Sequence, residues 1–308
     1  MTNIRAILIA GPTASGKSAA ALALAERLGG VVINADSMQV YEDLRVLTAR
    51  PGAEEEARAP HALYGFLAAR DAYSVGRWLA DVQGAIARAE AENRLPVITG
   101  GTGLYFKALL EGLAPVPDIP TVIRERWRAR ARDLDAPALH ALLAERDPEM
   151  ARRLRPSDPQ RIARALEVLE ATGRSLAQWQ NEPGDAVLNE AEVARIAITP
   201  ERDWLATRID ARFKTMLAQG ALDEVRVLKE QQLSPDLPVM RALGVAALMA
   251  HLQGDCPLEE VEMSVRTQTR RYAKRQMTWI RRNMVTWNML IEQDSERLLD
   301  RILSIIEE

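Results

Sequence analysis

The chain has 308 residues, of which 47% are hydrophobic and 27% charged, with a formal net charge of −3; this is typical of a globular protein with a well-buried core. These values exclude a small disulfide-stapled scaffold and a disordered chain, and no apolar run approaches the roughly 20 residues of a membrane span. One cysteine and three histidines offer no internal disulfide and no metal-ligand spacing, so we expect a soluble protein of the reducing cytoplasm without zinc.

Three short apolar segments predict strands of a parallel sheet. Residues 4–10 lead into a glycine-rich loop and then an Ala- and Leu-rich helix that ends near Leu28. The segment of residues 31–34 is followed closely by Asp36, and the segment of residues 95–99 is followed by a Gly-Gly-Thr-Gly turn. Strands that alternate with helices form parallel sheets covered on both faces, and ligands gather at the carboxyl ends of the strands. The sequence therefore predicts an α/β fold with a P-loop NTPase-like core.

A helical insertion is predicted in the middle of the chain. Residues 114–120 form a proline-rich hinge, and residues 123–180 are arginine-rich and helical with no strand pattern. Strand character returns at residues 193–199, which we expect to be the last core strand, followed by helices to the end. We therefore expect a core of residues 1–117 and 190–308 and an inserted all-helical domain of residues 118–189.

The octapeptide after the first strand matches the phosphate-loop pattern G-x-x-x-x-G-K-[ST]. At this spacing, backbone N–H groups surround a phosphate at a helix N-terminus, Lys17 meets phosphoryl oxygens and the hydroxyl of Ser18 binds Mg²⁺. The ligand therefore carries a di- or triphosphate. The predicted phosphate-binding residues are Gly11, Pro12, Thr13, Ala14, Ser15, Gly16, Lys17 and Ser18.

Asp36 is the carboxylate at the end of the second predicted strand, at the same edge of the sheet as the phosphate loop. An NTPase usually has an apolar strand ending in an acid that holds Mg²⁺, but the strand at residues 95–99 ends in glycines. A single carboxylate near a phosphate site suggests a general base that deprotonates an acceptor. A solvated turn residue or an indirect ligand of Mg²⁺ is the alternative for Asp36.

Several motifs together resemble the tRNA dimethylallyltransferase family, and they follow its order from one end of the chain to the other. The last of these motifs, at residues 269–281, is the most specific, because no general structural requirement would produce this sequence in unrelated proteins. The matching segments are GPTASGKS (11–18), DSMQVY (36–41), TARP (48–51), PVITGGTGLYFKALLEG (96–112), DPQRIARALEVLEATG (158–173), RIDARF (208–213) and TRRYAKRQMTWIR (269–281).

The resemblance implies a transfer of a dimethylallyl group from dimethylallyl diphosphate to N6 of adenosine 37 in the tRNA anticodon loop. Asp36 would then be the base for the adenine amine, and Arg208 would contact the diphosphate, although Arg212 lies one helical turn further and offers the same group. The inserted domain would bind tRNA. The residues implied in tRNA contacts are Asp36, Ser37, Met38, Gln39, Thr102, Arg124, Gln160, Arg161, Ile162, Ala163 and Arg164.

A second basic region lies near the C-terminus. Residues 263–291 contain seven lysines and arginines and no acid, and these bases fall on one half of a helix whose other half is apolar. Like charges at this density repel one another and suit a track for RNA phosphates. We therefore expect Arg270 and Lys274 to contribute to tRNA binding.

The sequence leaves two alternatives to this function, another enzyme activity and a binding function without catalysis. A P-loop kinase or an isopentenyltransferase acting on free AMP needs the same loop and acid, but neither needs the insertion or the basic helix. A nucleotide-gated RNA-binding module without catalysis is the third possibility, which Asp36 beside an intact phosphate loop disfavours. Mg²⁺ is the expected cofactor, no membrane contact is expected, and a monomer is assumed because the apolar spacing gives no coiled-coil signal.

Overall fold

The structure of the protein is a computed structural model that describes residues 4–307. It divides into two compact units. One unit contains the chain up to Leu110 and from Val187 onward, and the other is Glu111–Ala186. The observed unit begins seven residues before the expected insertion of residues 118–189 and ends three residues before it does. Val187 and Leu188 belong to the first unit because both backbone N–H groups donate to the carbonyl of Leu109.

The first unit is built on a six-stranded parallel sheet with the order β3-β2-β4-β1-β5-β6. This confirms the predicted α/β fold and the three predicted strands. The strand expected at residues 193–199 is also present, but it is not the last one, because three residues near the C-terminus add another strand at the edge of the sheet. The strands are β1 (Ala6–Ala10), β2 (Val31–Asn34), β3 (His61–Ala62), β4 (Pro96–Gly100), β5 (Val193–Ile198) and β6 (Asn288–Leu290).

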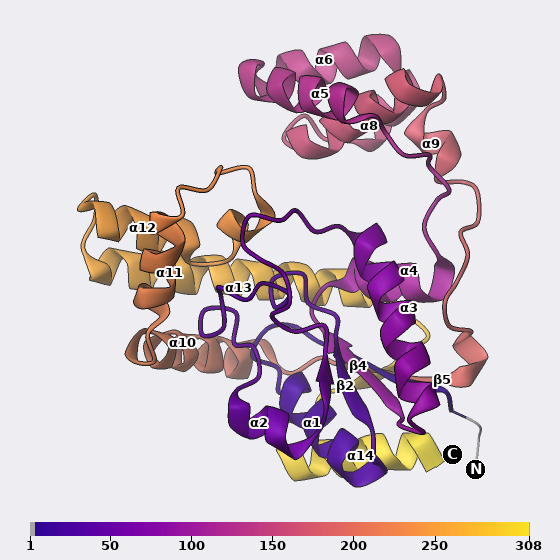
Figure 1. Ribbon diagram of the computed structural model, residues 1–308, viewed down its shortest axis with the longest axis vertical. Helices are drawn as coiled ribbons and strands as arrows, with labels where there is room; N and C mark the ends of the chain where they lie inside the picture. Colours follow the sequence, from indigo (N-terminus) through magenta and orange to yellow (C-terminus); the bar gives the residue numbers. More distant parts are fainter. Residues whose placement is uncertain (1–3, 308) are drawn as a thin grey trace. The chain divides into compact units, whose positions relative to one another are not determined.

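Helices cover both faces of this sheet, as the alternation along β1 requires. Ile7 and Ile9 pack toward α1 (Lys17–Leu28) and α14 (Ser295–Glu307). Leu8 points to the other face, under α3 (Val75–Ala91) and α4 (Gly103–Glu111). Figure 1 shows these layers around β2, β4 and β5. The carboxyl ends of β1, β2 and β4 are thereby left for the loops that carry the predicted site.

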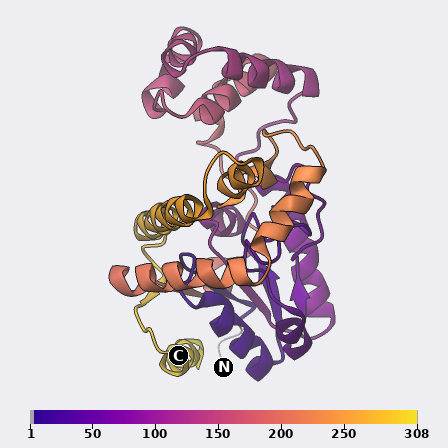
Figure 2. The same ribbon diagram turned by 90° about the vertical axis from the view of Figure 1, so that its left-hand side faces the viewer.

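Further helices of the same unit pack against the segment that follows β2. Their shared core includes Tyr41 and Leu44 from that segment and Phe213 and Val265 from the helices. Helix α13 lies against α10, as Figures 1 and 2 show. These helices are α10 (Arg202–Ala218), α11 (Ala221–Glu230), α12 (Val245–Gln253) and α13 (Leu258–Asn283). The short helix α2 (Ala53–Arg58) buries none of its residues.

The second unit is all-helical, as predicted for the insertion. Its core is formed by Trp127, Leu139, Leu143 and Leu166. Aspartates cap three of its helices at the N-terminus and are followed by proline in the first turn, which favours sharp helix starts. The helices are α5 (Thr121–Asp133), α6 (Ala136–Arg146), α7 (Pro148–Arg153), α8 (Pro159–Thr172) and α9 (Leu176–Trp179). Within residues 4–307, no helix is long and apolar enough to cross a membrane.

Candidate active site

The phosphate loop connects β1 to α1 at the carboxyl edge of the sheet. Gly16 has a φ of +93° and directly precedes α1, whose first turn contains no acid and receives no side-chain cap. The first N–H groups of α1 are therefore left for an anion, which the helix dipole also favours. Nζ of Lys17 donates to the carbonyl of Pro12 at 3.1 Å, so the lysine folds back over the loop.

Two arginines of α10 reach this loop. Nε of Arg208 donates to the carbonyl of Ala14 at 2.9 Å, and a terminal nitrogen of Arg212 donates to Oγ1 of Thr13 at 3.4 Å. The sequence left open which arginine serves the diphosphate site. The structure brings both to the loop, because residues four apart on a helix lie on the same face.

The phosphate loop and Asp36 form one electrostatic cluster. Burial lowers the pKa of Lys17 to about 8, while the Asp36 carboxylate opposes this shift and Arg212 adds to it. Burial also lowers the pKa of Arg212, and Asp36 again acts in the opposite direction. The cluster therefore has an excess of positive charge with one nearby carboxylate, which suits a diphosphate beside a proton acceptor.

Asp36 follows β2 in a turn held by hydrogen bonds. Its Oδ1 accepts from the N–H of Met38 at 2.9 Å, while its Oδ2 lies toward Gly101, 3.5 Å from the position a methyl group would take there. Burial raises the pKa of Tyr64, Tyr105 and Tyr272, and the Asp36 carboxylate acts in the same direction on all three. The carboxylate therefore acts electrostatically on three tyrosines and lies next to the loop after β4.

The Gly-Gly-Thr-Gly turn after β4 packs closely against the Asp36 turn. A Cβ at Gly100 would lie 2.1 Å from the carbonyl oxygen of Ala35, so glycine is required there for steric reasons. Oγ1 of Thr102 accepts from the N–H of Ser37 at 3.0 Å and lies 3.4 Å from the Ser37 hydroxyl. Three residues expected to contact tRNA, Asp36, Ser37 and Thr102, are therefore brought together by two neighbouring strands.

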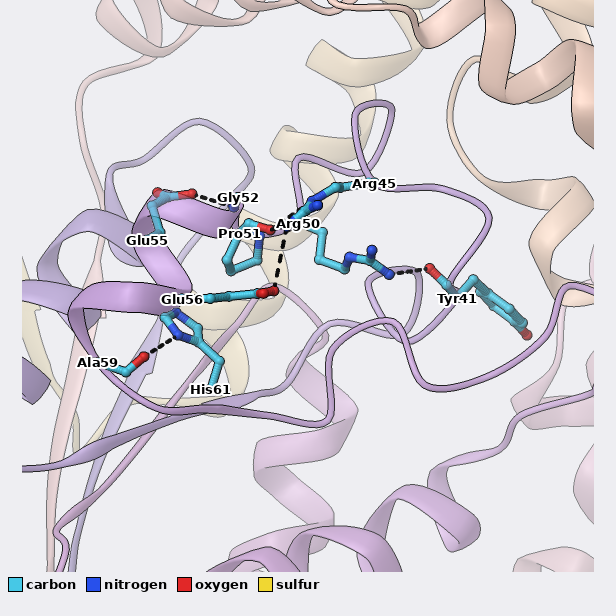
Figure 3. Close-up of polar contacts among 9 residues, drawn as sticks. All are labelled: Tyr41, Arg45, Arg50, Pro51, Gly52, Glu55, Glu56, Ala59 and His61. Carbon is cyan, nitrogen blue, oxygen red and sulfur yellow. Dashed lines mark hydrogen bonds and ion pairs between the residues drawn. The ribbon is translucent and has the colours of Figure 1, made fainter.

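The side chain of Gln39 supports the fold of the protein itself. Its Nε2 donates to the carbonyls of Thr48 and Ala49 at 3.0 and 2.9 Å, so this amide nitrogen braces the protein's own TARP turn. A side-chain nitrogen of Arg50 donates to the carbonyl of Tyr41 at 3.1 Å, as Figure 3 shows. The TARP motif therefore supports the segment that begins with the Asp36 turn.

Glu224 is a supporting residue that sequence reasoning missed. From α11, its carboxylate accepts hydrogen bonds from three consecutive N–H groups, those of Arg45, Val46 and Leu47, at 2.6 to 2.9 Å. Arg45 in turn donates to the carbonyl of Pro51 and lies 3.7 Å from Glu56 (Figure 3). No local signal could have revealed Glu224, because its partners lie nearly 180 residues earlier.

The residues of the helical insertion that were expected to contact tRNA differ in exposure. Ile162 and Ala163 are 0% and 4% exposed, so their side chains face the interior of their own unit. The expectation that these two side chains contact RNA is therefore corrected. Arg161 is exposed and pairs with Asp158, and Arg164 pairs with Glu167. Gln160 is exposed on the first turn of α8, and Arg124 of α5 donates to the carbonyl of Ile119 at 3.3 Å.

Arg266 and Arg270 of the basic helix pair with acidic residues. Helix α13 begins at Leu258, and its first turns contain Glu262, which pairs with Arg266. Arg270 pairs with Asp210 of α10, so its charge is partly offset. Lys274 is exposed on the same helix. The one-sided charge seen in the sequence is therefore reduced by acids from outside residues 263–291.

A metal ion near the phosphate loop would find few protein ligands among the described residues. Residues 4–307 contain no group of three or more His, Cys, Asp or Glu side chains that could hold one. Ser18 is exposed in the first turn of α1, where a P-loop supplies one hydroxyl ligand. The site thus fits a cation that takes most of its ligands from donor phosphate oxygens and water.

The parallel sheet, the phosphate loop at its carboxyl edge and the adjoining carboxylate define a P-loop enzyme of the α/β class. Comparisons with known proteins narrow this class. The pattern of the family described as "IPP transferase" matches residues 39–283, and that of a family described as "Isopentenyl transferase" matches residues 4–64.

Individual relatives match nearly the whole chain. A tRNA dimethylallyltransferase from Nitrobacter hamburgensis is 54% identical, with 97% of this chain and 94% of the relative covered. One from Parvibaculum lavamentivorans is 52% identical, with 99% and 96% covered. The chain therefore belongs to the tRNA dimethylallyltransferase family. It is a prenyltransferase, of a family that uses a divalent metal ion.

Solved structures agree with this assignment. A full-length tRNA isopentenylpyrophosphate transferase from Bacillus halodurans has a TM-score of 0.69 and 31% identity, with 98% of this chain and 96% of that chain covered. A eukaryotic dimethylallyltransferase described as acting on tRNA has a TM-score of 0.74 and 28% identity, with 89% and 69% covered. These matches support the dimethylallyltransferase over a kinase or an enzyme acting on free AMP.

Proposed function

We propose that the chain transfers the dimethylallyl group of dimethylallyl diphosphate to N6 of adenosine 37 in the tRNA anticodon loop. The products are N6-isopentenyladenosine and diphosphate. The observation that carries this proposal is that the Asp36 carboxylate acts electrostatically on Lys17 of the phosphate loop and on Arg212, which itself donates to Thr13 of that loop. A donor diphosphate and an acceptor amine can thus meet beside one proton acceptor.

In the reaction, the bond between the allylic carbon and the diphosphate oxygen breaks while a bond from that carbon to N6 forms. The departing diphosphate gains charge, which the N–H groups at the start of α1, Lys17 and the two α10 arginines stabilise. Mg²⁺ held by Ser18 and the phosphates would supply further positive charge to the leaving group.

Asp36 takes the proton that N6 loses. The exocyclic amine of adenine is a weak nucleophile, so removing this proton as the bond forms contributes about 10²- to 10⁴-fold if Asp36 resembles other general bases. Oδ1 is held by the N–H of Met38, which leaves Oδ2 for the proton.

The acceptor base must leave its stack to reach this site, as in other enzymes that act on bases. We propose that Ser37, Met38, Gln39 and Thr102 line its path. Exposed Gln160 and Arg161, and the side chains of Arg124 and Arg164, would bind tRNA from the insertion. Arg270 and Lys274 would bind RNA phosphates. The enzyme is proposed to act as a monomer in the cytoplasm, where the lone Cys256 stays reduced.

The proposal is tested by reacting the protein with dimethylallyl diphosphate, Mg²⁺ and unmodified tRNA, followed by mass analysis of nucleoside 37. The expected product is adenosine carrying one added five-carbon group. A matched tRNA with guanosine at position 37 should remain unmodified, and AMP should take up no label. Transfer to AMP instead of tRNA, or to another nucleoside, would overturn the assignment.

A further inference from the structure

Gln276 is the polar member of the buried face of α13. The other buried residues of this helix are Val261, Val265, Ala273 and Ile280, whereas Gln276 is 7% exposed. Burying an amide costs free energy unless its donor and acceptor are both hydrogen-bonded. A methionine would fill a similar volume without this cost, so packing alone does not account for a glutamine here.

Both ends of the Gln276 amide are hydrogen-bonded to loops of the active site. Its Oε1 accepts from the backbone N–H of Thr13 in the phosphate loop at 2.9 Å. Its Nε2 donates to the backbone carbonyl of Gly101 in the turn after β4, also at 2.9 Å. One side chain therefore joins two loops that follow different strands, 263 and 175 residues away from it in the sequence.

The two loops serve the two substrates of the proposed reaction. Thr13 belongs to the loop for the donor diphosphate, and its hydroxyl also meets Arg212. Gly101 precedes Thr102, whose hydroxyl holds the Ser37 N–H next to Asp36. The amide that connects the loops thus spans from the donor side to the acceptor side.

The geometry at Gly101 places this amide close to the base. A methyl group at Gly101 would lie 2.2 Å from Nε2 of Gln276 and 3.5 Å from Oδ2 of Asp36. Gly101 therefore admits the amide because it has no side chain. Nε2 of Gln276 and Oδ2 of Asp36 therefore both lie near the position that a side chain at Gly101 would take.

We infer that Gln276 is a positioning residue that sets the distance between the donor loop and the acceptor base, an inference that rests on the proposed function. It touches neither reacting group and acts through the backbones of Thr13 and Gly101. A misplacement of reacting groups by about 1 Å can reduce a rate about 100-fold. Loss of this bridge should therefore slow the transfer step more than it weakens the binding of either substrate.

Two substitutions separate the hydrogen bonds from the volume of the side chain. Gln276→Met removes both hydrogen bonds at similar size. Gln276→Glu keeps an acceptor for the Thr13 N–H but sets a carboxylate oxygen against the Gly101 carbonyl. The matched control is Gln268→Met, two turns earlier on α13, where the glutamine is exposed and bonds only to Ser264 of its own helix.

The measurement is the single-turnover rate of transfer to tRNA with both substrates saturating, together with Kd for tRNA, KM for the donor and the thermal unfolding midpoint. Both Gln276 variants should show a rate about 10- to 100-fold lower, with Kd for tRNA and KM for the donor within about threefold of wild type. The Gln268 variant should match wild type in all four quantities.

A saturated rate within about twofold of wild type for both Gln276 variants would overturn the inference. It would also fail if the whole loss appeared in KM for the donor, because Gln276 would then only shape the phosphate loop. If Gln276→Met does not fold, Gln276→Glu, which is closest to wild type in shape, decides the outcome. A wild-type protein that modifies no tRNA would instead refute the proposed function, so the two failures are distinguishable.

Discussion

The side chain of Asn34 holds both peptide groups of Asp36. Its Oδ1 accepts from the Asp36 N–H at 2.8 Å, and its Nδ2 donates to the Asp36 carbonyl at 3.0 Å. Nδ2 also donates to the carbonyl of Leu63 at 2.9 Å, and Nε1 of Trp78 donates to the carbonyl of Asn34 at 2.9 Å. Asn34 is fully buried, so the backbone that carries the proposed base is determined from inside the core.

Replacing Asn34 by aspartate should therefore reduce both stability and activity. Asn34→Asp exchanges an amide that donates to two carbonyls for a carboxylate oxygen that faces them. We expect a loss of about 1–3 kcal/mol in the free energy of unfolding, the usual cost of a buried group left without its partner. Urea denaturation and single-turnover rates check this, with Asn93→Asp at an exposed turn as the control. Unchanged stability would show that the Asn34 hydrogen bonds do not hold this turn.

Removing the charge of Asp36 should slow chemistry without weakening tRNA binding. Asp36→Asn retains an acceptor for the Met38 N–H but is a far weaker base. The single-turnover rate should fall about 10²- to 10⁴-fold, while Kd for tRNA stays near that of wild type. Asp71→Asn, at an exposed position, is the matched control. An unaltered rate for Asp36→Asn would rule out its role as the base.

Lys17 predicts a pH dependence of donor use. Its pKa of about 8 in the free protein means that the amine loses its proton as the pH rises through that value. A neutral amine attracts a diphosphate less, so kcat/KM for the donor should decline above about pH 8 with a slope approaching −1. Lys17→Arg stays protonated and should lack this decline, whatever its absolute activity. A wild-type profile that stays flat to about pH 9.5 would contradict the prediction.

The ion pair between Arg270 and Asp210 predicts unequal roles for the two basic residues of α13. Lys274→Ala should lower tRNA affinity and reduce the slope of log K against log salt by about one. Arg270→Ala should have a smaller effect because Asp210 already offsets its charge, and Asp210→Asn should raise affinity. Binding titrations between about 50 and 200 mM salt measure these slopes. Arg27→Ala, in the last turn of α1, is the control, and equal slopes for all variants would remove α13 from the RNA interface.

Much of the fold was readable from the sequence because the signals are local. The strand, glycine-rich loop and helix around residues 4–28 are determined by neighbouring residues, and the parallel sheet follows from repeating this unit. β3 and β6 were missed because they have two and three residues, too few for a periodic pattern, and form only by pairing with strands already in place.

For the site, the sequence alone determined the phosphate loop and pointed to Asp36, because spacing along one segment sets which groups can surround a phosphate. Only the tertiary structure decided that Arg208 and Arg212 both reach that loop, that Glu224 braces the segment after Asp36, and that Gln276 joins Thr13 to Gly101. These contacts connect residues more than 170 positions apart. The packing of α10, α11 and α13 determines these contacts, and no periodic sequence pattern indicates them.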